Sequence, residues 1–106
     1  MKKNLESLKY KEDTEVIAKF AKALGHPTRI AILKHLENQS CCFTGDLVDV
    51  FPLAQSTISQ HLRELKNVGL IQGELKPPKI KYCINKENWE IAKQVFADFF
   101  NNKRVY

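Results

Sequence analysis

The feature that most constrains this chain is a pair of short amphipathic segments that lie almost end to end near its middle. The first runs from Thr44 to Phe51 and the second starts at Gln55, so that only residues 52–54 separate them. Pro52 closes the first segment because proline has no backbone N–H to continue the helical hydrogen bonds. Two helices joined by a turn of three or four residues are the sequence form of a helix-turn-helix. We therefore expect the rest of the chain to pack around such a unit.

The second of these helices is expected to run from Gln55 to about Val68 and to stop at Gly69. Its apolar stripe, which contains Ile58 and Leu62, would anchor it, and its other face carries short polar side chains. A helix that enters the major groove of DNA needs both features. The alternative is an ordinary amphipathic surface helix, but such a face normally carries more Glu and Lys. The predicted DNA contacts on this helix are Gln55, Ser56, Thr57, Ser59, Gln60, His61 and Arg63, and for His61 contact with the preceding helix is the alternative.

The remaining segments predict three further helices and a β-hairpin. Apolar residues recur at steps of three or four from Asp13 to Gly25, at every second position in the hairpin, and at steps of three or four again after Asn85. The expected order is α-α-α-α-β-β-α, which is a mainly α fold with a small β-hairpin wing (α+β), a winged helix-turn-helix. We expect residues 1–12 to form an N-terminal arm and residues 13–106 to form the DNA-binding and dimerisation domain. The further elements are helices at 13–24, 27–38 and 86–102, a short strand at 41–43, and hairpin strands at 70–75 and 80–84.

The tip of the predicted hairpin is basic. Lys76, Lys79 and Lys81 lie at or near it, and Glu74 is the only acidic residue of the hairpin. Lysines at a turn are usually solvated charge, but beside a helix of the kind described above they are well placed for phosphate contact. The formal net charge of +5 also favours a polyanionic partner. We therefore add Lys76 and Lys79 to the predicted contacts with double-stranded DNA.

The size and content of the chain argue against an enzyme or a membrane protein. Its 106 residues fit one domain, with no room for a separate catalytic module. No glycine-rich phosphate loop is present, and no nucleophile, base and orienting group form a recognisable motif. No apolar run approaches the roughly 20 residues that span a bilayer, and the start lacks the apolar stretch of a signal peptide. The odd number of cysteines does not fit a secreted disulfide framework, so we expect a cytoplasmic protein.

Two separate blocks of the sequence resemble the arsenic-repressor (ArsR/SmtB) family. The first is Ala23-Leu-Gly-His-Pro-Thr-Arg-Ile-Ala-Ile-Leu33, and the second is Leu53-Ala-Gln-Ser-Thr-Ile-Ser-Gln-His-Leu62, followed by Leu65 to Ile71. The resemblance covers about residues 14–84. It implies a homodimeric repressor that binds an inverted-repeat operator, with base contacts at Gln55, Ser56, Ser59 and Gln60 and backbone support from Arg63. The chain departs from the family at the wing, where Pro77-Pro78 replaces the usual Gly-Arg tip.

The same resemblance raises the question of a metal inducer, because many members of the family release DNA on binding a metal or arsenite. One family site uses two cysteines before the third helix, and the corresponding positions here are Phe43 and Gly45. Another uses histidine and carboxylates on the last helix, but residues 86–102 contain no histidine. We therefore expect both sites to be missing. His26, beside Pro27, is expected to cap or pack rather than to bind a metal.

The three cysteines leave two interpretations open. If the strand at 41–43 pairs with the strand at 80–84, Cys83 comes within cross-strand reach of Cys41 or Cys42, with β-carbons about 4.5–5.5 Å apart. Such a pair would either oxidise or contribute to a thiolate site for a soft ion such as arsenite or cuprous copper. The other interpretation is that these cysteines are small buried hydrophobes without a sensing role. No cofactor is certain from the sequence.

The last helix carries more aromatic surface than one small core readily hides, which predicts a dimer interface. The expected interface residues are Phe20, Trp89, Phe96, Phe99 and Phe100. The predicted function is thus a sequence-specific repressor, released by a thiol-directed inducer such as arsenite, a soft metal or an oxidant. The alternative is a winged helix used as a protein-interaction or thiol-metal-binding module without operator specificity. An interaction surface would be expected to carry aromatic or leucine anchors in place of the small polar face at 55–60.

Overall fold

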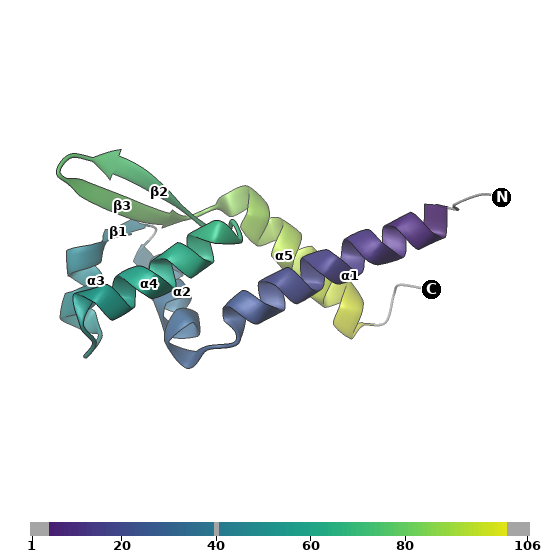
Figure 1. Ribbon diagram of the computed structural model, residues 1–106, viewed down its shortest axis with the longest axis horizontal. Coiled ribbons are helices and arrows are strands. Elements are labelled where there is room, and N and C mark those ends of the chain that lie inside the picture. The colour runs from purple at the N-terminus through teal and green to yellow at the C-terminus, as the bar shows by residue number, and fades with distance from the viewer. Residues whose placement is uncertain (1–4, 40, 102–106) are drawn as a thin grey trace.

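The computed structural model describes residues 5–39 and 41–101, with side chains described from residue 13 onward. Five helices and a three-stranded antiparallel sheet form a mainly helical winged helix-turn-helix, as predicted (Figure 1). Figure 1 shows the sheet and the helix-turn-helix at one end of the molecule, and α1 crossing α5 toward the other end. The elements are α1 (Leu5–Leu24), α2 (Pro27–Gln39), β1 (Cys41–Phe43), α3 (Thr44–Val50), α4 (Gln55–Asn67), β2 (Ile71–Lys76), β3 (Lys79–Ile84) and α5 (Lys86–Phe100).

Helix α1 begins at Leu5, well before the start expected at Asp13. Residues 5–12 therefore continue this helix, although their sequence predicted an arm or at most one extra turn, and residues 1–4 lie outside the described part. The first helix ends at Leu24, immediately before Gly25, as predicted. Its charged first half shows no obvious apolar period, which is why the sequence placed the helix start too late.

The core lies where α2, α3 and α4 meet the base of the hairpin. Side chains from all three helices and from Leu70 and Ile71 are almost completely buried there, and each contributes about 1.5–3 kcal/mol through removal from water. On α2 the buried face contains Ile32, which is 0% exposed, whereas Ile30 is 36% exposed. The residues with the most complete burial are Ile32, Leu36, Leu47, Ile58, Leu62, Leu65, Leu70 and Ile71.

The sheet joins the wing to the helix-turn-helix. Its strand order is β1-β3-β2, so β3 is central and β1 pairs with it antiparallel, as the sequence predicted. The register places Cys41 opposite Cys83 and Phe43 opposite Lys81. Because β1 continues directly into α3, this pairing fixes where the helix-turn-helix begins.

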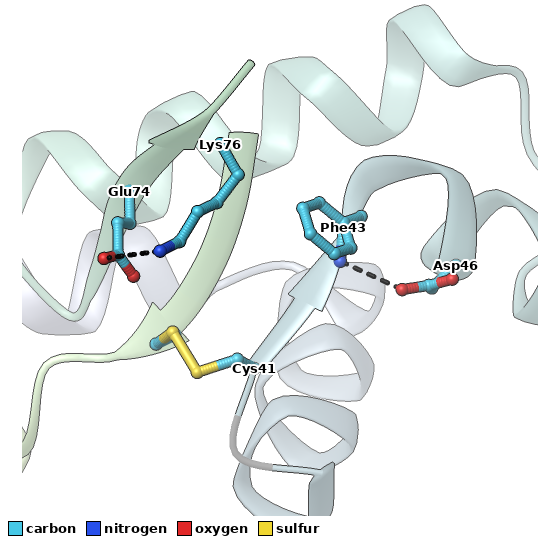
Figure 2. The surroundings of a disulfide bond; sticks show 6 residues. Cys41, Phe43, Asp46, Glu74 and Lys76 are labelled. Carbon is cyan, nitrogen blue, oxygen red and sulfur yellow. Dashed lines mark hydrogen bonds and ion pairs between the residues drawn. A yellow bond between two sulfur atoms is a disulfide. The ribbon is translucent and has the colours of Figure 1, made fainter. Parts of the chain in front are cut away.

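The ends of the helices show which polar groups satisfy the free backbone N–H groups. Asn85 caps α5, since its Oδ1 accepts a hydrogen bond from the Asn88 N–H at 3.1 Å. At α3, Thr44 is the first helical residue and Phe43 occupies the cap position. The Phe43 N–H donates to Asp46 Oδ2 at 3.1 Å, so the Asp46 side chain stabilises the start of this helix (Figure 2).

Candidate nucleic-acid interface

Helix α4 has the two-faced construction that its sequence predicted. Ile58, Leu62 and Leu65 are 0% exposed and hold the helix against the core. The opposite face consists of polar side chains that are exposed or, for Ser59, half-buried. Five of the seven predicted DNA contacts on this helix are fully on the exposed side, namely Gln55, Ser56, Thr57, Gln60 and Arg63.

Hydrogen bonds organise part of this exposed face. Arg63 Nη2 donates to Gln60 Oε1 at 2.7 Å, and Gln60 Nε2 donates to Glu64 Oε2 at 3.1 Å. Both polar groups of the Gln60 amide are therefore occupied in the free protein. Contact of Gln60 with a base would exchange these surface hydrogen bonds for bonds to the base edge.

A groove of about 480 Å³ lies between α4 and the wing. It brings predicted contacts from the helix together with Lys79 of the wing, whose Nζ lies 5.6 Å from the centre of the Phe43 ring. Lys76 does not line this groove, and its Nζ lies 3.4 Å from Glu74 Oε2 in an exposed ion pair, which Figure 2 shows on the wing. The groove-lining residues that the sequence singled out are Gln55, Ser59, Arg63 and Lys79.

His61 does not lie on the exposed face, so its predicted DNA contact is corrected here. Its side chain is 7% exposed, and its Nδ1 accepts a hydrogen bond from Arg29 Nε at 3.1 Å. Arg29 also donates to the Ala23 carbonyl oxygen at 3.3 Å, and the His26 ring lies 4.3 Å from that of His61. Burial lowers the pKa of His61, and the nearby His26 and Arg29 lower it further. Arg29, which the sequence did not mark as functional, thus connects α4 to the end of α1.

The cysteines divide into a pair and a single buried thiol. Cys41 and Cys83 form a disulfide between β1 and β3, so the predicted cross-strand approach is confirmed (Figure 2). Cys42 is 6% exposed, and burial, followed by the negative charge of Asp46, raises the pKa of its thiol. Among the side chains described, those of residues 13–39 and 41–101, no three His, Cys, Asp or Glu are grouped so as to hold a metal ion.

The residues expected at a dimer interface have different exposures. Phe20 is 5% exposed within its own chain and belongs to the core, which corrects its assignment to the interface. Trp89 and Phe96 are partly buried against that core. Phe99 and Phe100 are 56% and 76% exposed and form an exposed aromatic end on α5. These two phenylalanines are the part of the predicted interface that remains open to a partner.

Comparison with known proteins identifies the family. The model for "Bacterial regulatory protein, arsR family" matches residues 26–72. The uncharacterized HTH-type transcriptional regulator MJ1325 of Methanocaldococcus jannaschii is 44% identical over 86 residues, which are 79% of this chain and 96% of that protein. The HTH-type transcriptional repressor SmtB of Mycobacterium tuberculosis is 36% identical over 72 residues, covering 68% of this chain and 53% of the relative.

The fold agrees with these sequence matches. The ArsR-like transcriptional regulator from Rhodococcus sp. RHA1 superposes with a TM-score of 0.72 at 20% identity, covering 84% of this chain and 83% of that one. No helix in the described part of the chain is both long and apolar enough to cross a membrane. The chain therefore belongs to the ArsR/SmtB family of winged-helix, DNA-binding transcriptional regulators and is not an enzyme.

Proposed function

We propose that this protein is a cytoplasmic repressor that binds an inverted-repeat operator as a homodimer. The observation that carries the proposal is the groove in which Gln55, Ser59 and Arg63 of α4 face Lys79 of the wing. A recognition helix and a basic wing on one surface supply the two kinds of contact that specific DNA binding needs. Base edges give sequence preference, and phosphates give affinity and orientation.

Within this surface we assign different tasks to the two ends of α4. Gln55, Ser56, Ser59 and Gln60 lie in its first two turns and carry side chains that hydrogen-bond to base edges. Arg63 lies further along the helix, and we assign it with Lys79 to the phosphate backbone. Asp46 also lines the groove, and its negative charge opposes close approach of phosphate at that edge.

Phe99 and Phe100 support the homodimer, because their rings are more than half exposed at the end of α5. Large exposed aromatic side chains are common at protein interfaces. The two rings contact each other edge to face, with centres 5.1 Å apart, and so form one apolar patch. Pairing of this patch with its copy in a second subunit would bury both patches. Each subunit would then present its own α4 to one half-site, with the two half-sites about one turn of the DNA helix apart.

For the inducer we propose a thiol-directed agent, which is arsenite, a soft metal ion or an oxidant acting at the cysteines. The position of Cys41 directly opposite Cys83 in the sheet, where the two form a disulfide, supports this assignment. Cys42 was also a predicted sensor, but its burial favours a packing role.

Selection of binding sites from random double-stranded DNA tests the proposed function. We expect an inverted repeat whose half-sites are about 10–10.5 base pairs apart, centre to centre. Recovery of sequences without a shared motif would contradict operator specificity and would favour the protein-interaction alternative. Repeating the selection with arsenite, zinc or peroxide present shows whether any of them removes the protein from the recovered site.

A further inference from the structure

A second basic surface lies on α4, away from the wing. It is a pocket of about 530 Å³ where the end of α1 and the start of α2 meet the last turns of α4, and we call it the α1–α2 pocket. In Figure 1 the turn from α1 into α2 lies on the opposite side of α4 from the wing. Among its described lining residues, Glu64 is the only acidic one, and the basic ones are Lys19, Lys22, His26 and Arg29. Such an excess of basic side chains favours an anionic ligand.

The α1–α2 pocket and the groove beside the wing flank the same exposed face of α4. Ser59 and Arg63 line the groove, whereas Glu64 and Val68 line the pocket. Because each residue of a helix is turned about 100° from the one before it, Gln60 lies between Ser59 on one flank and Glu64 on the other. The polar face that carries Gln60 therefore has one basic surface on each side.

A helix inserted into the major groove of DNA lies between two phosphate backbones. The major groove is about 12 Å wide, and an α-helix with its side chains is about 10–12 Å across, so each flank of the helix comes close to one backbone. Lys79 supplies positive charge on the wing flank of α4. The α1–α2 pocket supplies positive charge on the flank that the wing does not reach.

Hydrogen bonds hold this pocket in place beside α4 and leave donors free. Arg29 Nε donates to His61 Nδ1 at 3.1 Å, and Arg29 Nη1 donates to the Ala23 carbonyl oxygen at 3.3 Å. Within the part of the chain that the structure describes, these bonds use two of the five guanidinium N–H groups, and the others can donate to an anion. His26 Nδ1 accepts from the Thr28 N–H at 3.3 Å, so the neutral ring carries its proton on Nε2 and can donate it as well.

The two lysines of the pocket are exposed and come from one face of α1. Lys19 and Lys22 are three residues apart, and residues at this spacing are neighbours on a helix surface. Each carries a compact charge on a flexible stem, which suits contact with a phosphate without a fixed geometry. Together with Arg29 they form a basic edge that runs along the pocket beside α4.

We propose that the α1–α2 pocket binds the DNA backbone on the side of α4 opposite the wing, with Lys19, Lys22 and Arg29 contacting its phosphates. This inference rests on the proposed function and extends the DNA-binding surface beyond the groove that carries it. The two backbones that border the major groove are then held by different parts of the chain, one by the wing and one by the α1–α2 pocket. Phosphate contacts of this kind add affinity and orientation but no base preference.

The salt dependence of DNA binding by the full chain tests the proposal. The double variant Lys19→Gln, Lys22→Gln removes two exposed charges from the pocket and leaves the Arg29 hydrogen bonds in place. Each lost phosphate contact reduces by about 0.9 the slope of the logarithm of the binding constant against the logarithm of salt concentration, so we expect a reduction of about 2. Operator and random DNA should lose affinity alike, most strongly at low salt.

A matched control separates a local contact from the loss of net charge. The double variant Lys34→Gln, Lys86→Gln removes two exposed lysines that do not line the pocket and should keep the slope of the parent protein. Equal slopes for the two double variants overturn the inference, as does a loss of affinity confined to the operator. Failure of the proposed function is distinguishable, because a protein without operator preference still shows the expected change of slope on random DNA.

Ethylation of single phosphates in the operator tests where the pocket binds. For each half-site, the parent protein should be sensitive to two sets of phosphates, one along each border of the major groove. The double variant Lys19→Gln, Lys22→Gln should lose sensitivity to one set, and Lys79→Ala should lose sensitivity to the other. Loss of the same set by both variants, or of neither set by the double variant, would show that the pocket does not bind the backbone opposite the wing.

Discussion

Single side chains on α4 illustrate how one helix serves both the fold and the proposed interface. Gln60 and His61 are neighbours in sequence, yet Gln60 is exposed and His61 is 7% exposed. A step of about 100° per residue along a helix is enough to turn one side chain to solvent and the next into the core. Two consecutive polar residues in the same motif therefore have different physical roles.

At Gln60 we predict a loss of base preference. Gln60→Ala should reduce the preference of the protein for its operator by about 1–3 kcal/mol, because it removes a side chain able to bond a base edge. Lys79→Ala, the phosphate-contact control, should weaken binding to all sequences alike. It should also reduce by about 1 the steepness with which the logarithm of the binding constant falls with the logarithm of salt concentration. Binding titrations on operator and random DNA at several salt concentrations measure both effects. Equal losses on the two DNAs for Gln60→Ala would exclude base contact by that residue.

At His61 we predict a dependence of stability on pH. Its pKa is lowered in the folded chain, so the unfolded chain binds this proton more tightly and protonation favours unfolding. The stabilisation is complete above the unfolded pKa of about 6.5 and falls as pH decreases toward the folded pKa, by less than about 1.4 kcal/mol per pH unit. Protonation would also prevent Nδ1 from accepting the Arg29 hydrogen bond.

Urea unfolding between pH 5 and 8 measures this dependence. Relative to the parent protein, His61→Gln should be destabilised less at low pH than at neutral pH. The control variant His35→Gln leaves the hydrogen bond between Arg29 and His61 in place and should keep the pH dependence of the parent. A constant difference between His61→Gln and the parent across the range would argue against this role of His61.

At the scale of elements, the connection between α4 and the wing depends on a particular backbone geometry. Gly69 follows α4 with a φ of 86°, in the left-handed region that side chains disfavour. Its carbonyl oxygen accepts a hydrogen bond from Asn88 Nδ2 at 2.8 Å. This contact connects the end of the recognition helix to the first turn of α5. The glycine thus permits both the turn into β2 and the close approach of α5.

Gly69→Ala should therefore destabilise the fold by at least about 1–2 kcal/mol, the cost of the left-handed conformation for a residue with a Cβ. An added Cβ would also lie 2.7 Å from Asn88 Nδ2, which requires that side chain to move. Gly45→Ala in α3 is the matched control, since nothing lies within 4 Å of its added Cβ. Urea unfolding should show no loss, or a small gain, for the control. Equal stability of the two variants would contradict this account of Gly69.

At the scale of the whole molecule, the exposed aromatic end of α5 and the α4–wing groove are distinct surfaces. One is apolar and supports the proposed dimer, and the other is polar and basic and supports DNA binding. A dimer through α5 would leave both grooves available for the two half-sites. The disulfide joins β1, which leads into α3, to β3, which precedes α5.

Removal of the aromatic end should separate the subunits. The double variant Phe99→Glu, Phe100→Glu should sediment as a monomer at micromolar concentration and bind the operator more weakly, because the two half-site contacts are no longer linked. Leu75→Glu, at a wing residue that is 67% exposed, should remain dimeric. Analytical ultracentrifugation measures the mass, and a dimeric double variant would place the interface elsewhere.

The sequence by itself determined the order of the elements, the helix-turn-helix and the family, because these follow from local signals. Apolar period, the stops at Gly25 and Gly69, and the cap at Asn85 depend only on neighbouring residues. Only the tertiary structure decided which side chains those elements turn inward or bring together. It buried His61 against Arg29, 32 residues away, and Phe20 in the core, and it decided that Cys41 rather than Cys42 lies opposite Cys83, 42 residues away in the sequence. Such contacts depend on how helices and strands pack, and packing is a property of the whole fold rather than of any local pattern.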